Sequence, residues 1–133
     1  MKQLSLVLMT LALGLTLQTW ADVPRPQDFT SVSLIELIGN PAKYDGKLVR
    51  VYGFLHLEFE GEALYLHRED YERRLFTNSL HVDIDTCKSV RGGPFNDGYV
   101  QIEGRFVAAP ELGRMEPGFI RDILRCEEFP SNN

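Results

Sequence analysis

The sequence predicts a small, mainly β domain: a closed five-stranded barrel with a short N-terminal helix before its first strand. Five stretches of strand-like composition follow one short helical stretch in a chain of 133 residues. Two of the strands are interrupted by glycines, Gly53 and Gly104. A long strand can serve both halves of a small barrel only if it bends sharply, and glycine is where a bend or bulge is placed.

An apolar leader comes first and is typical of a secretory signal peptide. Lys2 gives residues 1–21 a positive start, residues 4–17 are an apolar run, and Ala21 completes a small-residue cleavage pattern. That run is too short for a membrane span, and an uncleaved anchor is the alternative. We therefore expect a periplasmic or secreted protein with a bacterial Sec-type signal peptide, whose single domain covers residues 22–133 and has no membrane span after cleavage.

Two short helical segments precede the strands. Ser33 and Glu36 have the spacing of a capping box, residues 34–38 carry an apolar stripe, and a glycine follows them. Pro41 then suits the first position of a second helical turn, and Gly46 suits its exit. These signals predict one short helix followed by a single helical turn.

Alternation of apolar and polar residues defines the strands and the side of each that faces the core. We expect them within residues 48–59, 63–67, 79–85, 99–108 and 119–126, and the last has no clear period. A charged stretch between the second and third strands predicts one or two helical turns, and an irregular loop precedes the fourth. The residues expected to face the core are Val49, Val51, Gly53, Leu55, Leu57, Phe59, Leu64, Leu66, Leu80, Val82, Ile84, Val100, Ile102 and Phe106.

Three stretches resemble small uncharacterised bacterial secreted proteins with an OB-fold-like barrel: "YDGKLVRVYGFLHLEFEGEALYLHREDYE", "NSLHVDI" and "YVQIEGRF". The resemblance covers residues 31–125 and implies an OB-like fold, without an activity or site residues. The chain departs from ordinary OB proteins in one respect. Its clear helix precedes the first strand, and residues 87–98 replace the usual helix between the third and fourth strands.

Cys87 and Cys126 are the two cysteines of the chain. An even count in an exported protein predicts one disulfide, which would stabilise the domain by roughly 4 kcal/mol for a loop of about 40 residues. In the OB topology the third and fifth strands are parallel neighbours, so both sulfurs would lie at the same rim. No CxxC occurs, which argues against a redox motif or a zinc knuckle.

The outward face of the first three strands is the predicted ligand site. OB barrels use outward aromatic residues beside basic residues to stack on bases, sugars or peptide side chains. Phe54 shares the face, although the N-terminal helix could instead cover Tyr52 and Phe54 and bury them. The ligand-binding residues that we expect are Arg50, Tyr52, Tyr65, His67 and His81.

A second candidate is a metal site on the same face. Strand parity turns all three histidines of the chain outward, and Asp83 shares the face of the third strand. Neutral imidazoles suit zinc and copper, but the spacing matches no recognised ligand motif, and solvent-exposed histidines are the alternative. The set would be His56, His67, His81 and Asp83, and we assign no cofactor.

Charge and missing motifs limit the function. The net charge of −5 argues against nucleic acid, which needs lysine and arginine to replace counterions. No GxSxG, HExxH, P-loop or GxGxxG occurs, so we expect no enzyme and assign no catalytic residues. We expect a non-catalytic periplasmic or envelope binding module for a protein, peptide or small-molecule ligand. The alternatives are an interaction protein, such as an inhibitor or immunity factor for a secreted toxin, and a metal-binding protein using the histidine face.

Overall fold

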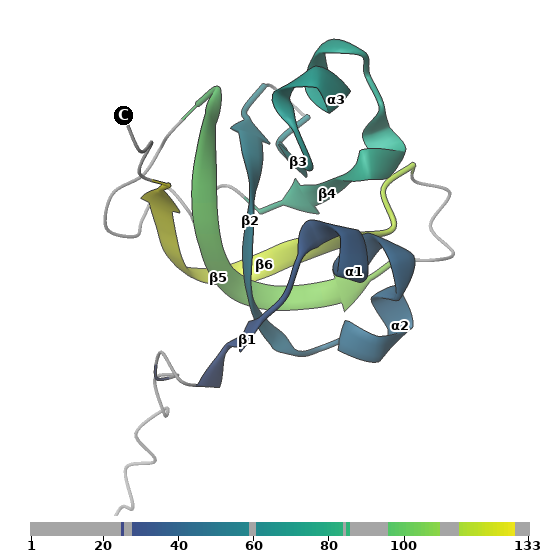
Figure 1. The fold of residues 1–133 in the computed structure, drawn as a ribbon. Coiled ribbons are helices and arrows are strands. Elements are labelled where there is room, and N and C mark those ends of the chain that lie inside the picture. The colour runs from purple at the N-terminus through teal and green to yellow at the C-terminus, as the bar shows by residue number, and fades with distance from the viewer. Residues whose placement is uncertain are drawn as a thin grey trace, which may run out of the picture.

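One sheet, rolled into a barrel, makes up most of the molecule (Figure 1). A computed structural model describes Arg25 and residues 28–58, 61–83, 85, 96–109 and 115–129. The described elements are β1 (Thr30–Ser31), α1 (Leu34–Gly39), α2 (Pro41–Tyr44), β2 (Leu48–His56), β3 (Ala63–Tyr65), α3 (Arg68–Glu72), the 3-10 helix η2 (Phe76–Asn78), β4 (Ser79–Val82), β5 (Gly98–Ala108) and β6 (Gly118–Glu128).

The barrel closes in the order β2-β3-β4-β6-β5 and back to β2. Neighbouring strands are antiparallel except β4 and β6, which run parallel with His81 beside Phe119 and Val82 beside Ile120. This is the strand order of an OB barrel, which confirms the predicted fold class of a mainly β, small five-stranded OB-like barrel with a short N-terminal helix. The short β1 adds a parallel strand beside β2.

Two glycines allow the long strands to approach their neighbours closely. A Cβ on Gly53 would lie 2.7 Å from the backbone oxygen of Tyr65, and one on Gly104 would lie 2.9 Å from that of Arg121. The β5–β6 register shifts between Glu103 and Arg105, on either side of Gly104. The irregularity agrees with the bend or bulge predicted at Gly104, and Figure 1 shows β5 curving around the barrel. At Gly53 the structure shows the close approach, with a regular β2–β5 register.

The barrel core contains the predicted inward residues. Phe59 and Ile84 of that prediction lie outside the described residues. Leu57 and Leu66 pack against the core and are partly exposed. The other aliphatic and aromatic residues of the prediction are fully buried. β6 adds Ile120, Ile123 and Cys126 to this core. Its contribution was not predicted because its sequence lacks a clear period.

The N-terminal helix packs against the barrel core. The Glu36 backbone N–H donates to the Ser33 hydroxyl, which is one half of the predicted capping box. The Glu36 carboxylate does not complete the box with Ser33; it accepts from Lys43 at 2.9 Å and from Tyr44 at 3.1 Å. These two bonds hold the Glu36 pKa below its usual value. Leu34 and Leu37 of α1 are buried in the barrel core, so the idea that this helix covers Tyr52 and Phe54 is wrong.

α3 covers the outward face of β2 and β3 instead. Beneath it lies a second apolar cluster of Phe54, Ala63 and Tyr65, against which Tyr71 and Phe76 pack. Two hydrogen bonds of the Asp70 carboxylate hold α3 in place over this cluster. The carboxylate accepts from the backbone N–H of His67, just before α3, at 2.9 Å and from the Asn78 side chain at 2.8 Å. The outer side of the barrel is therefore a second packed layer here.

Residues 1–21 and Cys87 lie outside the described residues. The signal peptide and the disulfide therefore stay predictions, although the proposed partner Cys126 is fully buried. No described helix has both the length and the apolar character that a membrane span requires.

Candidate functional site

The five predicted ligand residues lie in different environments. Tyr52 is exposed on β2, and His67 is exposed at the start of α3. Tyr65 is only 1% exposed, because α3 covers the part of the face on which parity placed it. The prediction that Tyr65 lies on an open surface is therefore wrong, although the prediction that it points away from the barrel core is right. Arg50 is half-buried on β2, and His81 is half-buried on β4.

The four predicted metal ligands do not come together. His56 points outward but is buried, stacked on Tyr71 at 3.8 Å between ring centroids, with its Nδ1 2.6 Å from Asp97. His67 instead lies beside Asp70 at the start of α3. Within the described parts of the chain, no three His, Cys, Asp or Glu side chains gather as metal ligands would.

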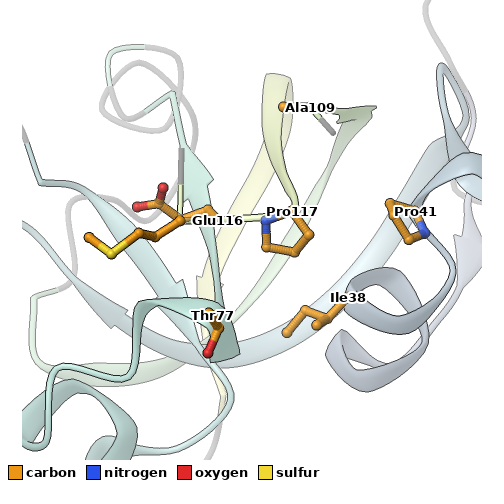
Figure 2. A pocket seen from close by; sticks show the side chains of 7 residues that line it. Ile38, Pro41, Thr77, Ala109, Glu116 and Pro117 are labelled. Carbon is orange, nitrogen blue, oxygen red and sulfur yellow. The ribbon is translucent and has the colours of Figure 1, made fainter. Parts of the chain in front are cut away.

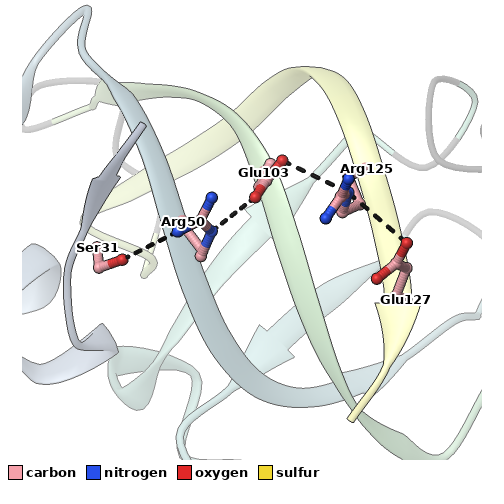
Figure 3. Close-up of polar contacts among 5 residues, drawn as sticks. All are labelled: Ser31, Arg50, Glu103, Arg125 and Glu127. Carbon is pink, nitrogen blue, oxygen red and sulfur yellow. Dashed lines mark hydrogen bonds and ion pairs between the residues drawn. The ribbon is translucent and has the colours of Figure 1, made fainter. Parts of the chain in front are cut away.

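Arg50 belongs to a row of charges across β2, β5 and β6 (Figure 3). At its centre the Glu103 side chain, 4% exposed, accepts from Arg50 Nε at 2.6 Å and lies 3.7 Å from Arg125 Nε. Arg125 also lies 3.6 Å from Glu127, and Arg50 donates weakly to Ser31. These side chains compensate one another, so the row gives Arg50 a structural role on the barrel surface. The sequence prediction missed Glu103, because an outward carboxylate resembles an ordinary solvated residue.

A pocket of about 480 Å³ lies where α3 and η2 meet the β2–β3 connection. We call it the Tyr65 pocket. Three aromatic and three charged side chains line it: Tyr65, Tyr71 and Phe76, and Glu58, Glu72 and Arg74. Sequence reasoning named only Tyr65. Tyr71 and Phe76 could have been suspected as the aromatic residues in a charged stretch, where they indicate a packed face.

Tyr65 lines this pocket with a side chain that is almost entirely buried. Its ring is buried in the second cluster, while its hydroxyl is not fully enclosed and has no hydrogen-bond partner among the described residues. Burial raises the pKa of this phenol above its usual value, and the negative charges of Glu58 and Glu116 raise it further. The hydroxyl therefore stays protonated at physiological pH and lies in a negative electrostatic environment.

An apolar groove of about 380 Å³ lies close by (Figure 2). Its walls come from α1, α2, η2 and the β5–β6 connection. Figure 2 shows Pro117 between Glu116 and Pro41, with Ile38 below it. The lining residues are Ile38, Pro41, Thr77, Ala109, Met115, Glu116 and Pro117. Met115 is 63% exposed, so the groove offers apolar surface to solvent.

Comparison of the chain with protein-family models, with curated proteins and with solved structures gives no match.

Proposed function

We propose that the protein is an exported, non-catalytic binding module of the periplasm or cell envelope, and that its Tyr65 pocket binds a cationic group of the ligand. The observation that carries this proposal is the lining of the pocket, in which three aromatic side chains, one of them the otherwise buried Tyr65, lie with the carboxylates of Glu58 and Glu72.

The chemistry of the lining favours an ammonium or guanidinium group. Aromatic faces attract cations through their quadrupole, and Tyr71 and Phe76 supply such faces beside the carboxylates of Glu58 and Glu72. A ligand N–H can also donate to the Tyr65 oxygen, for which the described residues supply no hydrogen-bond partner. Arg74 also lines the pocket, so the two carboxylates and this one guanidinium leave the lining with an excess of one negative charge.

The same features argue for binding without catalysis. A phenol whose pKa is raised holds its proton, so Tyr65 is a poor general base near neutral pH. The acidic balance of the chain, with a net charge of −5, attracts cationic ligands over a longer range. An inhibitor or immunity factor would use this pocket for a basic side chain of its target protein.

Export is the second part of the proposal, and the apolar leader supports it. Signal cleavage after Ala21 would give a mature protein that begins at Asp22. N-terminal sequencing of protein recovered from the periplasm should return Asp22 first. Recovery of the exported form with residues 1–21 attached would contradict this.

Titration with N-acetyl-lysine amide tests the pocket, with N-acetyl-norleucine amide as the uncharged probe of similar shape. NMR shifts should change at Tyr65, Tyr71 and Phe76 with the lysine probe and much less with the other. Tyr65→Phe removes only the hydroxyl and should weaken lysine binding by at least about tenfold, since a hydrogen bond to a charged group is worth about 1.5 to 3 kcal/mol. Tyr52→Phe alters an exposed tyrosine outside the pocket and is the matched control. Equal binding of the two probes, or equal effects of the two variants, would overturn the proposal.

A further inference from the structure

We infer that the ligand is a peptide segment carrying a basic side chain for the Tyr65 pocket and, one or two residues away, an apolar side chain for the groove. This inference rests on the proposed function and adds to it the groove, the class of ligand and the order of contacts.

The two sites share a wall. Phe76 lines the Tyr65 pocket, and the next residue, Thr77, lines the groove. Glu116 lines the groove from the β5–β6 connection, and its charge acts on the Tyr65 phenol. One short ligand can therefore reach both sites. Because Phe76 and Thr77 are consecutive, we expect the shortest spacings in the ligand, one or two residues, at an advance of about 3.3 Å per residue in an extended peptide.

The groove selects an apolar side chain. Ile38, Pro41, Pro117 and Met115 present mainly carbon to it, and methionine adapts its shape to an inserted group. Its volume of about 380 Å³ is large enough for a leucine or phenylalanine side chain. Glu116 adds a negative charge at this site, which complements a ligand whose neighbouring residue is basic.

A peptide fits better than a simple alkylamine. Thr77 is exposed between the two sites, and its hydroxyl can donate to or accept from a peptide backbone. An alkylamine offers no group there. The two sites also offer one position for an apolar side chain and another for a cationic one, and two side chains on one peptide backbone can occupy both together.

Calorimetric titration of the mature protein with capped peptides tests the inference. Acetyl-Leu-Gly-Lys-amide and acetyl-Leu-Lys-amide carry both side chains at the two expected spacings, and acetyl-Gly-Gly-Lys-amide carries only the basic one. The better of the first two should bind at least tenfold more tightly than the third, a difference of about 1.4 kcal/mol.

Variants of the groove then test whether the higher affinity of the leucine peptides comes from the groove. Met115→Gln should remove most of the advantage of the leucine peptides while leaving the affinity for acetyl-Gly-Gly-Lys-amide unchanged. Ile35→Gln is the matched control, because Ile35 is 64% exposed, as Met115 is at 63%, but does not line the groove.

The outcomes separate the two proposals. If acetyl-Gly-Gly-Lys-amide binds at the Tyr65 pocket but leucine adds nothing, the peptide inference fails and the proposed function stands. If no lysine peptide binds, both fail. If hexylamine binds as tightly as the better leucine peptide, the ligand class is wrong.

Discussion

Arg50→Met tests whether a buried charge pair stabilises the barrel surface. The variant keeps the aliphatic part of the side chain and removes the guanidinium that donates to Glu103 at 2.6 Å. It leaves a carboxylate that is 4% exposed, with Arg125 3.7 Å away as its remaining described ion-pair partner.

The expected cost follows from burial. Loss of a hydrogen bond to a charged group costs about 1.5 to 3 kcal/mol, and removing one partner of a fully buried pair costs about 3 to 5 kcal/mol. Because the Arg50 side chain is 23% exposed and Arg125 stays close, we expect a loss of about 2 to 3 kcal/mol in the free energy of unfolding. For a domain of this size the melting temperature should fall by about 8 to 12 °C.

Urea unfolding followed by circular dichroism measures this loss, since the only tryptophan, Trp20, lies in the predicted signal peptide. Arg125→Met is the control and should cost less than about 1 kcal/mol, because its ion pair is long and its side chain is 42% exposed. The double variant Arg50→Met, Glu103→Leu leaves no unpaired carboxylate and should be more stable than Arg50→Met alone. A double variant less stable than the single one would refute the reasoning.

Three further predictions concern the core, the Tyr65 phenol and the cysteines. Gly53→Ala should cost about 1 to 3 kcal/mol by overpacking, since its Cβ would meet the Tyr65 backbone at 2.7 Å, whereas Gly98→Ala, with open space around it, should be nearly neutral in urea unfolding. The Tyr65 pKa is raised in the folded protein, so stability should fall as the pH rises above the usual tyrosine value of about 10. Urea midpoints measured over this pH range should fall less for Tyr65→Phe than for the parent protein. Identical pH profiles for the two proteins would argue against this. Cys87 and Cys126 should resist thiol labelling in denatured, unreduced protein, and Cys87→Ser should cost about 4 kcal/mol; labelling of both would show that the bridge is absent.

The barrel interior could be predicted because one physical rule decides it. Successive side chains of a strand point to opposite faces, so the apolar alternation of β2 identified Val49, Val51 and Leu55 as core residues, and all three are fully buried. The helix signals at Ser33 and Pro41 worked for a similar reason, because capping and proline geometry are local.

The outer face could not be predicted in the same way. Parity gives the direction of a side chain but not what covers it, and α3 covers Phe54, His56 and Tyr65. The Tyr65 pocket depends on how α3 and η2 pack across the sheet, which no single stretch of sequence encodes. The sequence analysis missed Glu103 because strand register, which side-chain parity does not give, places the two arginines beside it. Knowledge that β2 pairs with β5 would have revealed Arg50 opposite Glu103.

The parallel contact between β4 and β6 has a consequence for how the barrel opens. Among the described residues, it aligns only two residue pairs, His81 with Phe119 and Val82 with Ile120, whereas β2 and β5 align over Leu48–Leu55. Both contacts join distant parts of the chain, so the small number of aligned pairs makes the β4–β6 seam the weaker of the two. We expect this seam to form last in folding and to open first in native-state hydrogen exchange. Each opening exposes two strand edges, and at high concentration those edges are where one chain would pair with another.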